Sequence, residues 1–474
     1  MLVVSGVLFP SGAFAQSTDD DSVFDFSLPG ARSRAMGGAF VAVADDATSV
    51  YSNPAGLTTL FRPEVSLEVR HWNFTNLAVD QGHAYGAASN IGLDTLNGIR
   101  DRAFKFDVTG LSFLSFAYPK GTWAVGVFSH QLARYQMNRR MQGAFFDCIG
   151  GERGDNAREP FCEEQGVNRL FPADQAYDLS ILGTGATVAH HWMIKPRQNR
   201  DPQSPSIPTR KLSVGVTVQY FNFHLEGTRL VYNARGALNY APADWSTENI
   251  ELLGTRTGDD WAVGVNAGVL YDLTEKVAIG ATFRQGPKFQ YQAHTETGGG
   301  NPAGAGHVVV DPHDAPFKVP DTWALGVAFR PNNSWRIGIE YDRVMFAQLI
   351  EQIVNTAHVP TDPEGWMVED RLVQDNANQL RIGGEYSTTT FKDLLLSVRG
   401  GFWYDPLHQP YLRLDNEATG APAPGWSLLF PKREGNSHAT FGIGIANRQR
   451  FQVDIAVDYA QSATIYAASS VWRF

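Results

Sequence analysis

Residues 451–460 read FQVDIAVDYA, and this stretch shows the pattern that decides the fold. Its odd positions carry large apolar side chains, whereas its even positions carry Gln, Asp or Ala. Because successive side chains of a β-strand point to opposite faces, the alternation predicts a strand with one apolar face and one small or polar face. The same period of two recurs in WRIGIEYD at 335–342 and in QLRIGGEY at 379–386. The chain is therefore predicted to be all-β.

Alternation alone fits a soluble sandwich as well as a membrane barrel, and three further features favour the barrel. Aromatic residues such as Trp335 and Tyr341 bracket many apolar faces, which is typical of the girdles at the two membrane interfaces. Phe474 ends an apparent strand that resembles the terminal strand of bacterial outer-membrane barrels. Short turns alternate with long polar connections, which we expect at 74–109, 138–178, 231–258, 294–320, 351–377 and 407–436. We therefore expect a transmembrane antiparallel β-barrel of about fourteen strands over residues 61–474.

Composition and charge exclude several classes of protein. With 43% hydrophobic and only 19% charged residues, the chain can bury enough apolar surface to fold, so disorder is excluded. The formal net charge of -10 offers no basic surface to a nucleic acid. No apolar run of about 18 residues follows Ala15, so a bundle of transmembrane helices is excluded as well.

The N-terminal residues predict export. Residues 1–15 are apolar and end in Ala13-Phe14-Ala15, the small-x-small pattern of a signal-peptide cleavage site. The usual positively charged start is missing, so an ordinary apolar N-terminus is the alternative. Export would place Cys148 and Cys162 in an oxidising compartment, and we expect a disulfide that closes a loop of roughly 15 residues. A pair of free thiols is the alternative.

Residues 31–57, ARSRAMGGAFVAVADDATSVYSNPAGL, do not alternate as the later segments do. Gly37 and Gly38 lie among small residues that allow close packing of backbones, and Asn53-Pro54-Ala55 opens a turn. A compact segment of this kind ahead of the first strand could plug the lumen of a barrel. We therefore predict a plug, or hatch, over residues 16–60.

The order GGA, ADDA and NPAGL ahead of a β-barrel pattern resembles the hatch of the FadL family, outer-membrane transporters of long-chain fatty acids and aromatic hydrocarbons. The resemblance extends loosely through most of the chain, including LSVRGGFWYDP at 396–406. It implies a fourteen-stranded barrel with a hatch, an extracellular apolar groove, an internal pocket, and a kinked third strand that opens sideways into the membrane. On this analogy Asn53, Pro54 and Ala55 form the hatch motif.

The third apparent strand carries an independent sign of a kink. In TWAVGVFSHQLARY the apolar side chains follow odd positions up to Val127, yet Leu132 falls on an even position. A β-bulge between Phe128 and Gln131 would shift the phase in this way. An ordinary strand that frays into a loop is the alternative.

No sequence motif for catalysis, a cofactor or phosphate binding is present, so we expect no enzyme, no cofactor and no metal site. A carboxylate ligand that enters an apolar lumen loses hydration and needs a cation, for which arginine offers two parallel N–H groups. The candidate cations lie on the small or polar faces of their strands and are Arg284, Arg336, Arg381 and Arg399. Pairing with lumen carboxylates such as Glu340, Glu385 or Asp454 is the alternative. The candidate apolar lining is Phe116, Tyr118, Phe128 and Trp403.

Two functions are consistent with the sequence. The leading hypothesis is passive uptake of long-chain fatty acids or other hydrophobic compounds, such as aromatic hydrocarbons, by a monomeric barrel surrounded by lipid of the bacterial outer membrane. The alternative is a barrel of the same family that acts as a structural or protein-secretion accessory. The Pro-rich connection at 193–210 is the one sign that favours the alternative.

Overall fold

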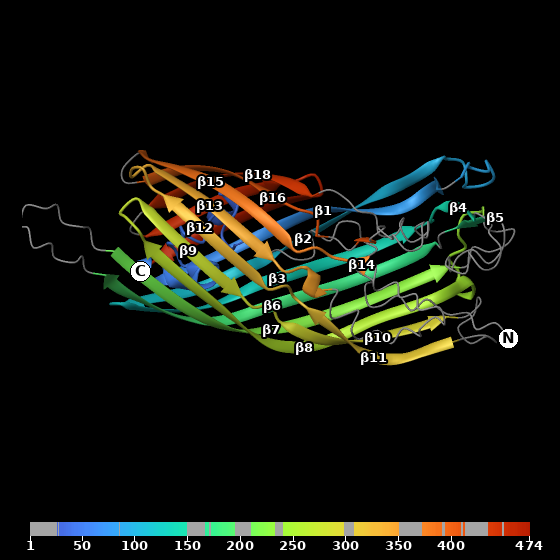
Figure 1. Cartoon of the computed structure of the whole chain (residues 1–474), viewed down its shortest axis with the longest axis horizontal. Coiled ribbons are helices and arrows are strands. Elements are labelled where there is room, and N and C mark those ends of the chain that lie inside the picture. The colour runs from blue at the N-terminus through green and yellow to red at the C-terminus, as the bar shows by residue number, and fades with distance from the viewer. Residues whose placement is uncertain are drawn as a thin grey trace, which may run out of the picture.

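The computed structural model describes most of the chain. The described residues are 26, 28–84, 86–148, 166–169, 172–194, 210–232, 240–297, 308–349, 372–390, 394–408, 411–412, 435–447 and 450–474. They form an elongated barrel of strands (Figure 1). No helix in this part of the chain is long and apolar enough to cross a membrane.

Nearly every element is a β-strand. The barrel wall consists of β1 (Glu64–Ala84), β2 (Gly98–Lys120), β3 (Trp123–Met141), β6 (Ala173–Ile194), β7 (Arg210–Tyr232), β8 (Ile250–Asp272), β9 (Val277–Arg284), β10 (Lys288–Thr297), β11 (Val308–Lys318), β12 (Thr322–Phe329), β13 (Trp335–Val344), β15 (Ala377–Thr390), β16 (Leu394–Asp405), β18 (Asn436–Asn447), β19 (Phe451–Tyr459) and β20 (Ala463–Arg473). The smaller elements are β4 (Phe145–Cys148), β5 (Gly166–Arg169), η5 (Thr247–Asn249), β14 (Leu372–Val373) and β17 (Tyr411–Leu412).

The wall closes on itself because β1 pairs with both β2 and β20. Two crossings of the wall are interrupted, one between β9 and β10 at 285–287 and one between β11 and β12 at 319–321. With each of these pairs counted as one strand, the barrel has 14 antiparallel strands. The predicted fold, an antiparallel barrel of about fourteen strands with an N-terminal plug, is confirmed.

The wall is much taller on one side than on the other (Figure 1). The end that carries the C-terminus has short turns such as 273–276 and 331–334, as the periplasmic end of a bacterial barrel does. Toward the opposite end, β1–β3, β6–β8, β10 and β11 continue well beyond β13–β20. The prediction of long loops is therefore wrong for much of 74–109, 138–178, 231–258 and 294–320, because strands occupy 74–84, 98–109, 138–141, 173–178, 250–258 and 308–318. Most of the other two predicted loops, 351–377 and 407–436, lies outside the described residues.

β7 shows why these extensions are hidden from the sequence pattern. Up to Tyr220, outward side chains such as Val218 are apolar and inward ones are small or polar. Beyond Tyr220, polar side chains face outward while Phe221 and Phe223 are buried inside, so the apolar face changes side. The outward apolar band thus ends at Tyr220 and at Trp261, whose rings stack 5.7 Å apart. This level marks the extracellular edge of the membrane-spanning part.

β3 contains the predicted β-bulge. Its register with β6 shifts between Gln131 and Ala133, which leaves Leu132 as the extra residue. Both Leu132 and Ala133 are buried. The side-chain amide of Gln131 donates to the Ala133 carbonyl at 2.6 Å and to the Ile181 carbonyl at 3.1 Å, so it bonds the backbone next to the bulge. The phase shift falls directly after the predicted interval, Phe128 to Gln131.

Candidate functional site

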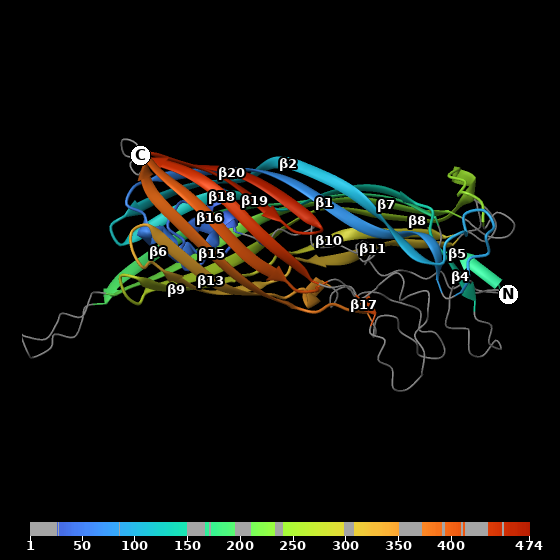
Figure 2. The same cartoon turned by 90° about the horizontal axis from the view of Figure 1, so that it is seen from above.

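The hatch, residues 28–60, fills the lumen near the periplasmic end (Figure 2). It contains three short helical elements, α1 (Ala31–Ala35), α2 (Ser49–Ser52) and η3 (Pro54–Thr59). Gly37 and Gly38 follow α1 with φ angles of 64° and 77°, a region that favours glycine. A side chain on Gly37 would press against the backbone of Ile382 and Phe402. Glycine is thus required where the hatch touches the wall.

The Asn53 side chain links the Asn53-Pro54-Ala55 turn to the rest of the hatch and to the wall. Its side-chain amide donates to the Val41 carbonyl at 2.8 Å and to the Val269 carbonyl of β8 at 3.1 Å. Its side-chain oxygen accepts from the Ala55 amide at 3.2 Å, and Pro54 opens η3 at a position where a helix needs no N–H donor. The predicted hatch motif therefore links two parts of the hatch to each other and to the wall.

Buried carboxylates of the wall accept hydrogen bonds from the hatch backbone. Glu340 on β13 accepts from the amides of Phe40 at 2.8 Å and Val41 at 2.7 Å. Glu68 on β1 accepts from the amide of Gly30 at 2.6 Å. Short helices leave many backbone groups without internal partners, and buried groups of this kind need others. The polar inner face of this half of the wall supplies them.

Glu385 on β15 lies at the centre of a network of ion pairs. It binds Arg32 of the hatch at 2.9 Å, Arg399 at 2.7 Å and Arg336 at 3.1 Å. Arg32 and Arg336 also bind Asp45 of the hatch, at 2.6 and 3.1 Å. Burial favours the neutral acid, but the charges of Arg32 and Arg336 lower the pKa of Asp45 to about 2. The network borders a cavity of about 550 Å³ among the periplasmic turns.

The arginines predicted as ligand cations hold the hatch in place. Arg336 and Arg399 belong to the network around Glu385. Arg284 on β9 donates to the carbonyl of Ser52 in the hatch at 2.9 Å. The contacts of Arg336 and Arg399 fit the alternative prediction, pairing with lumen carboxylates such as Glu385, whereas the hydrogen bond of Arg284 goes to a backbone carbonyl. A ligand contact at Arg399 stays a prediction.

Arg381 and Trp403 form a second cluster beside the hatch. The Arg381 guanidinium lies 4.1 Å from the Trp403 ring centre and pairs with Asp342 at 2.6 Å. Trp403 stacks on His438 at 3.7 Å between ring centres and donates to Asp458 at 3.2 Å. Both predicted residues therefore face inward, and a ligand contact at either one stays a prediction.

The prediction that Phe116 and Tyr118 face the lumen is wrong. These side chains are 43% and 44% exposed, whereas their neighbours Ser115 and Ala117 are buried against the hatch. Ser112 is an extra residue in the register of β2 with β1. It shifts the phase of the strand and turns Phe116 toward the lipid.

Phe128 faces inward, as predicted. Its ring makes an edge contact with Tyr51 of the hatch, with ring centres 5.7 Å apart, and stacks on Phe113 at 6.0 Å. Phe128 therefore packs on the hatch just below the bulge of β3.

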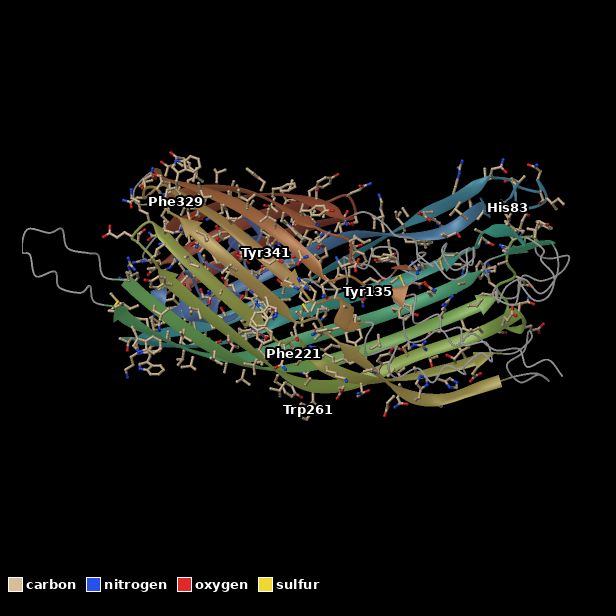
Figure 3. The ribbon with its side chains drawn as sticks, in the orientation of Figure 1. His83, Tyr135, Phe221, Trp261, Phe329 and Tyr341 are labelled. Carbon is tan, nitrogen blue, oxygen red and sulfur yellow. The ribbon has the colours of Figure 1, made fainter. Side chains whose placement is uncertain are left out.

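Further from the periplasm than the hatch, apolar side chains of the tall wall meet inside the barrel. This aromatic cluster comprises Phe74, Leu132, Ala133, Tyr135, Met137, Tyr177, Leu179, Ile181, Phe221, Phe223, Leu225, Phe289, Tyr291, Ala293, Ala315, Phe317 and Val319. Phe223 stacks on Phe289 with ring centres 4.7 Å apart and lies 5.2 Å from Phe317. Figure 3 shows Tyr135 and Phe221 between the ribbons and Trp261 projecting outside. The inner surface here is apolar while the outer surface is polar.

The sequence pattern missed nearly all of this cluster. Its residues lie in segments predicted as loops or at the ends of predicted strands. A usable signal is present in FNFHLEG at 221–227, where the period of two continues but the apolar residues move to odd positions. A continued period with a switched phase indicates a strand that leaves the membrane.

Several predictions concern groups that the structure does not describe. Residues 1–15, Cys162 and the side chain of Cys148 lie outside the described residues, so the signal peptide and the disulfide stay predictions. Within the described part of the chain, no group of three or more His, Cys, Asp or Glu side chains is arranged to hold a metal ion.

Comparison with known proteins identifies similar outer-membrane proteins. A family model described as outer membrane protein transport protein (OMPP1/FadL/TodX) matches residues 209–412. The Ralstonia pickettii toluene transporter TbuX is 16% identical, with a TM-score of 0.51 over 95% of this chain and 100% of that chain. A Pseudomonas aeruginosa FadL homologue is 11% identical, with a TM-score of 0.55 over 95% and 100% of the two chains. The Pseudomonas putida toluene transporter TodX is 15% identical, with a TM-score of 0.50 over 95% and 99%. No curated protein sequence matches the chain.

Proposed function

We propose that this chain, whose predicted resemblance to the FadL family is confirmed, is a bacterial outer-membrane channel for passive uptake of hydrophobic molecules. The observation that carries the proposal is the aromatic cluster inside a wall whose outer surface is polar at the same level. A hydrophobic molecule gains free energy when it leaves water for such a surface. Long-chain fatty acids and aromatic hydrocarbons are the two ligand classes, and the barrel acts as a monomer.

The bulge of β3 supports a sideways exit. Leu132 belongs to the aromatic cluster, and the register places it level with Leu182 on β6 and Asn222 on β7. This is the extracellular edge of the membrane-spanning part. A ligand stopped by the hatch meets the wall where the hydrogen-bond ladder is interrupted. We infer that the ligand leaves through the wall at Leu132 while the hatch keeps the lumen closed.

Deletion of Leu132 tests this proposal. Removal of the extra residue restores a regular register between β3 and β6 without altering the hatch. Uptake of a radiolabelled long-chain fatty acid and of toluene is measured in cells that lack their own channel for these compounds. We expect the parent protein to accelerate uptake and the deletion variant to lose most of the gain while it still folds, as judged by heat-modifiable migration.

The two possible failures have different meanings. If cells with the parent protein take up no more of either compound than cells with an empty vector, the proposed function is wrong. If the deletion variant transports as well as the parent, only the sideways exit is wrong. The alternative of a secretion accessory depended on the connection at 193–210, most of which lies outside the described residues. Among the residues that the structure does describe, no contact favours this alternative.

A further inference from the structure

The hydrogen-bond ladder of β8 is interrupted on one side of the strand. β8 pairs with β10 only up to Thr257 and with β9 only from Asn266 onward. Residues 258–265 of β8 therefore lie outside the ladder on this side, whereas on the other side they pair with β7 without a break. We call the boundary between 258–265 and the opposite residues, 285–291, the seam.

The residues across the seam bond toward β11 and β12. The amide of Gly286 donates to the Asp321 carboxylate at 2.8 Å, and the carbonyl of Pro287 accepts from the amide of Val319 at 2.9 Å. Pro287 itself has no N–H group to offer to β8. The break between β9 and β10 is thus held from the side of the wall that faces away from β8.

Asp260 supplies hydrogen bonds in place of the missing ladder. Its carboxylate accepts from the amide of Trp261 at 2.8 Å and, across the seam, from the amide of Gln290 at 2.8 Å. A backbone bond from Gln285 to the Val265 carbonyl, at 3.0 Å, closes the end of the seam that is nearer the periplasm. Because a side chain can rotate without moving a strand, the bonds of Asp260 are easier to exchange than a run of ladder bonds.

Rings of the aromatic cluster lie directly behind the seam. A side chain on Gly258 would come within 3.1 Å of the Phe223 ring, and one on Gly264 would come within 3.0 Å of the Phe221 ring. Ala262 lies between these two glycines and packs against the same cluster. The interrupted ladder is therefore backed by apolar side chains of the lumen.

The seam lies at the level of the bulge in β3. Trp261 is opposite Asn222 on β7, and the register places Asn222 level with Leu132. Trp261 projects outward at the edge of the membrane (Figure 3), and the exposed side chain of Val263 belongs to the apolar band below it. The seam thus reaches into the lipid. The strands β6, β7 and β8 separate it from the bulge, so the aromatic cluster has an interrupted ladder on each side of these three strands.

We propose that the seam is a second opening between the lumen and the lipid, and that Asp260 holds it closed. This inference rests on the proposed function and gives the same hydrophobic molecules a path besides the one at Leu132. When the Asp260 carboxylate exchanges its two amide partners for water, a molecule among the aromatic rings meets a wall without regular ladder bonds. At an intact ladder the same molecule would have to break several backbone bonds at once.

A thiol-reactive group on an acyl chain of a phospholipid tests for the opening. The two-chain lipid stays in the bilayer, so it reaches an inward cysteine only through the wall. The full-length protein with Cys148→Ser, Cys162→Ser and Ala262→Cys is inserted into vesicles that contain this lipid. We expect labelling of Ala262→Cys. Addition of Asp260→Ala should make it about tenfold faster, because two hydrogen bonds to a charged group are lost.

Ala324→Cys is the matched control for the position of the thiol. Ala324 also faces inward, but at this position β12 has unbroken ladders with both β9 and β13. We expect no labelling of this variant.

Asp259→Ala is the matched control for the loss of charge. Asp259 is exposed on the outer face, where it pairs with His224 at 2.7 Å. Its removal should leave the labelling rate of Ala262→Cys unchanged. Asp260→Asn, which keeps one acceptor oxygen, provides a second variant if Asp260→Ala fails to fold.

Uptake by cells connects the opening to the ligand. In the variant that lacks Leu132, the path at the bulge is closed and the seam carries the remaining uptake. Asp260→Ala in this background should raise uptake of the radiolabelled fatty acid and of toluene several-fold.

The outcomes separate the inference from the proposed function. Equal labelling of Ala262→Cys and Ala324→Cys, or no labelling of either, overturns the opening, and an unchanged rate with Asp260→Ala overturns the role of Asp260. Unchanged uptake with Asp260→Ala in the variant that lacks Leu132 overturns the path through the seam, while the proposed function stands. If the parent accelerates uptake of neither compound, the proposed function is wrong, whatever the labelling shows.

Discussion

On the periplasmic side of Tyr220 and Trp261, the wall presents apolar side chains outward and surrounds a hatch that buried ion pairs and hydrogen bonds link to the wall. On the extracellular side, it presents polar side chains outward and surrounds an aromatic cluster. The same strands build both regions. The polarity of the outer face matches its surroundings, which are lipid in one region and water in the other. The polarity of the inner face matches what the barrel encloses, because the backbone of the hatch needs polar partners whereas a hydrophobic ligand needs an apolar surface.

The two regions also differ in how they are held together. Buried ion pairs hold the hatch. Removal of one partner leaves the other charge buried without compensation, and this destabilises the folded protein. The aromatic cluster depends on contacts that can be exchanged for contacts with a ligand of similar polarity. The hatch region is therefore the one that a single substitution should disturb most.

Glu385→Gln should have the largest effect. The change removes the charge shared by Arg32, Arg336 and Arg399 and should cost about 3–5 kcal/mol, as loss of one partner of a buried ion pair does. The cost falls on the hatch, because the strand ladder does not involve this side chain. We expect higher ion conductance in planar bilayers from a barrel that still folds.

Glu275→Gln is the control for this prediction. Glu275 is exposed and borders the same cavity outside the network, so its loss should leave the conductance at the parent level. If Glu385→Gln conducts no more ions than the parent and melts at the same temperature, the network of ion pairs does not hold the hatch.

A lysine scan on β7 should locate the boundary between the two regions. Val216 and His224 both face outward, but only Val216 lies within the apolar band. Val216→Lys should destabilise the folded barrel by about 2–4 kcal/mol, whereas His224→Lys should cost at most about 1 kcal/mol. Urea titration of the barrel in lipid vesicles measures both values. Equal costs would mean that the membrane extends over both positions.

Gln131→Ala should have the smallest effect. The substitution leaves the carbonyls of Ala133 and Ile181 without this donor and should cost about 1 kcal/mol. Amide hydrogen exchange should become faster around the bulge and stay unchanged in the hatch. Gln136→Ala, an exposed position on the same strand, serves as the control, and equal exchange in the two variants would argue against a role for Gln131 at the bulge.

The membrane-spanning region could be predicted from the sequence because every strand that crosses the lipid must present apolar side chains on its outer face. The period of two, the aromatic girdles and the phase slip near Leu132 were all readable, as was the hatch around Asn53. Phe116 could not be assigned, since the extra residue Ser112 reverses the phase without changing the composition. The extracellular region was missed because its apolar face is inside, where the pattern resembles a polar loop.

The candidate site was harder to predict than the fold. Arg336 and Arg399 were identified as inward cations, but only the structure shows that hatch and wall carboxylates hold them. Strand register also brings Phe74, Phe223 and Phe317 from distant segments into one aromatic cluster, and no local sequence feature gives that register.

The most direct test of the central claim is the position of a bound ligand. A crystal of the protein with a long-chain fatty acid brominated near the end of its tail would locate the bromine by anomalous scattering. We predict that the bromine lies inside the barrel among Phe223, Phe289 and Tyr135, on the extracellular side of the hatch. Bromine found only on the outer face of the wall, or in the cavity bordered by Glu385, would contradict the claim that the extracellular half holds the ligand.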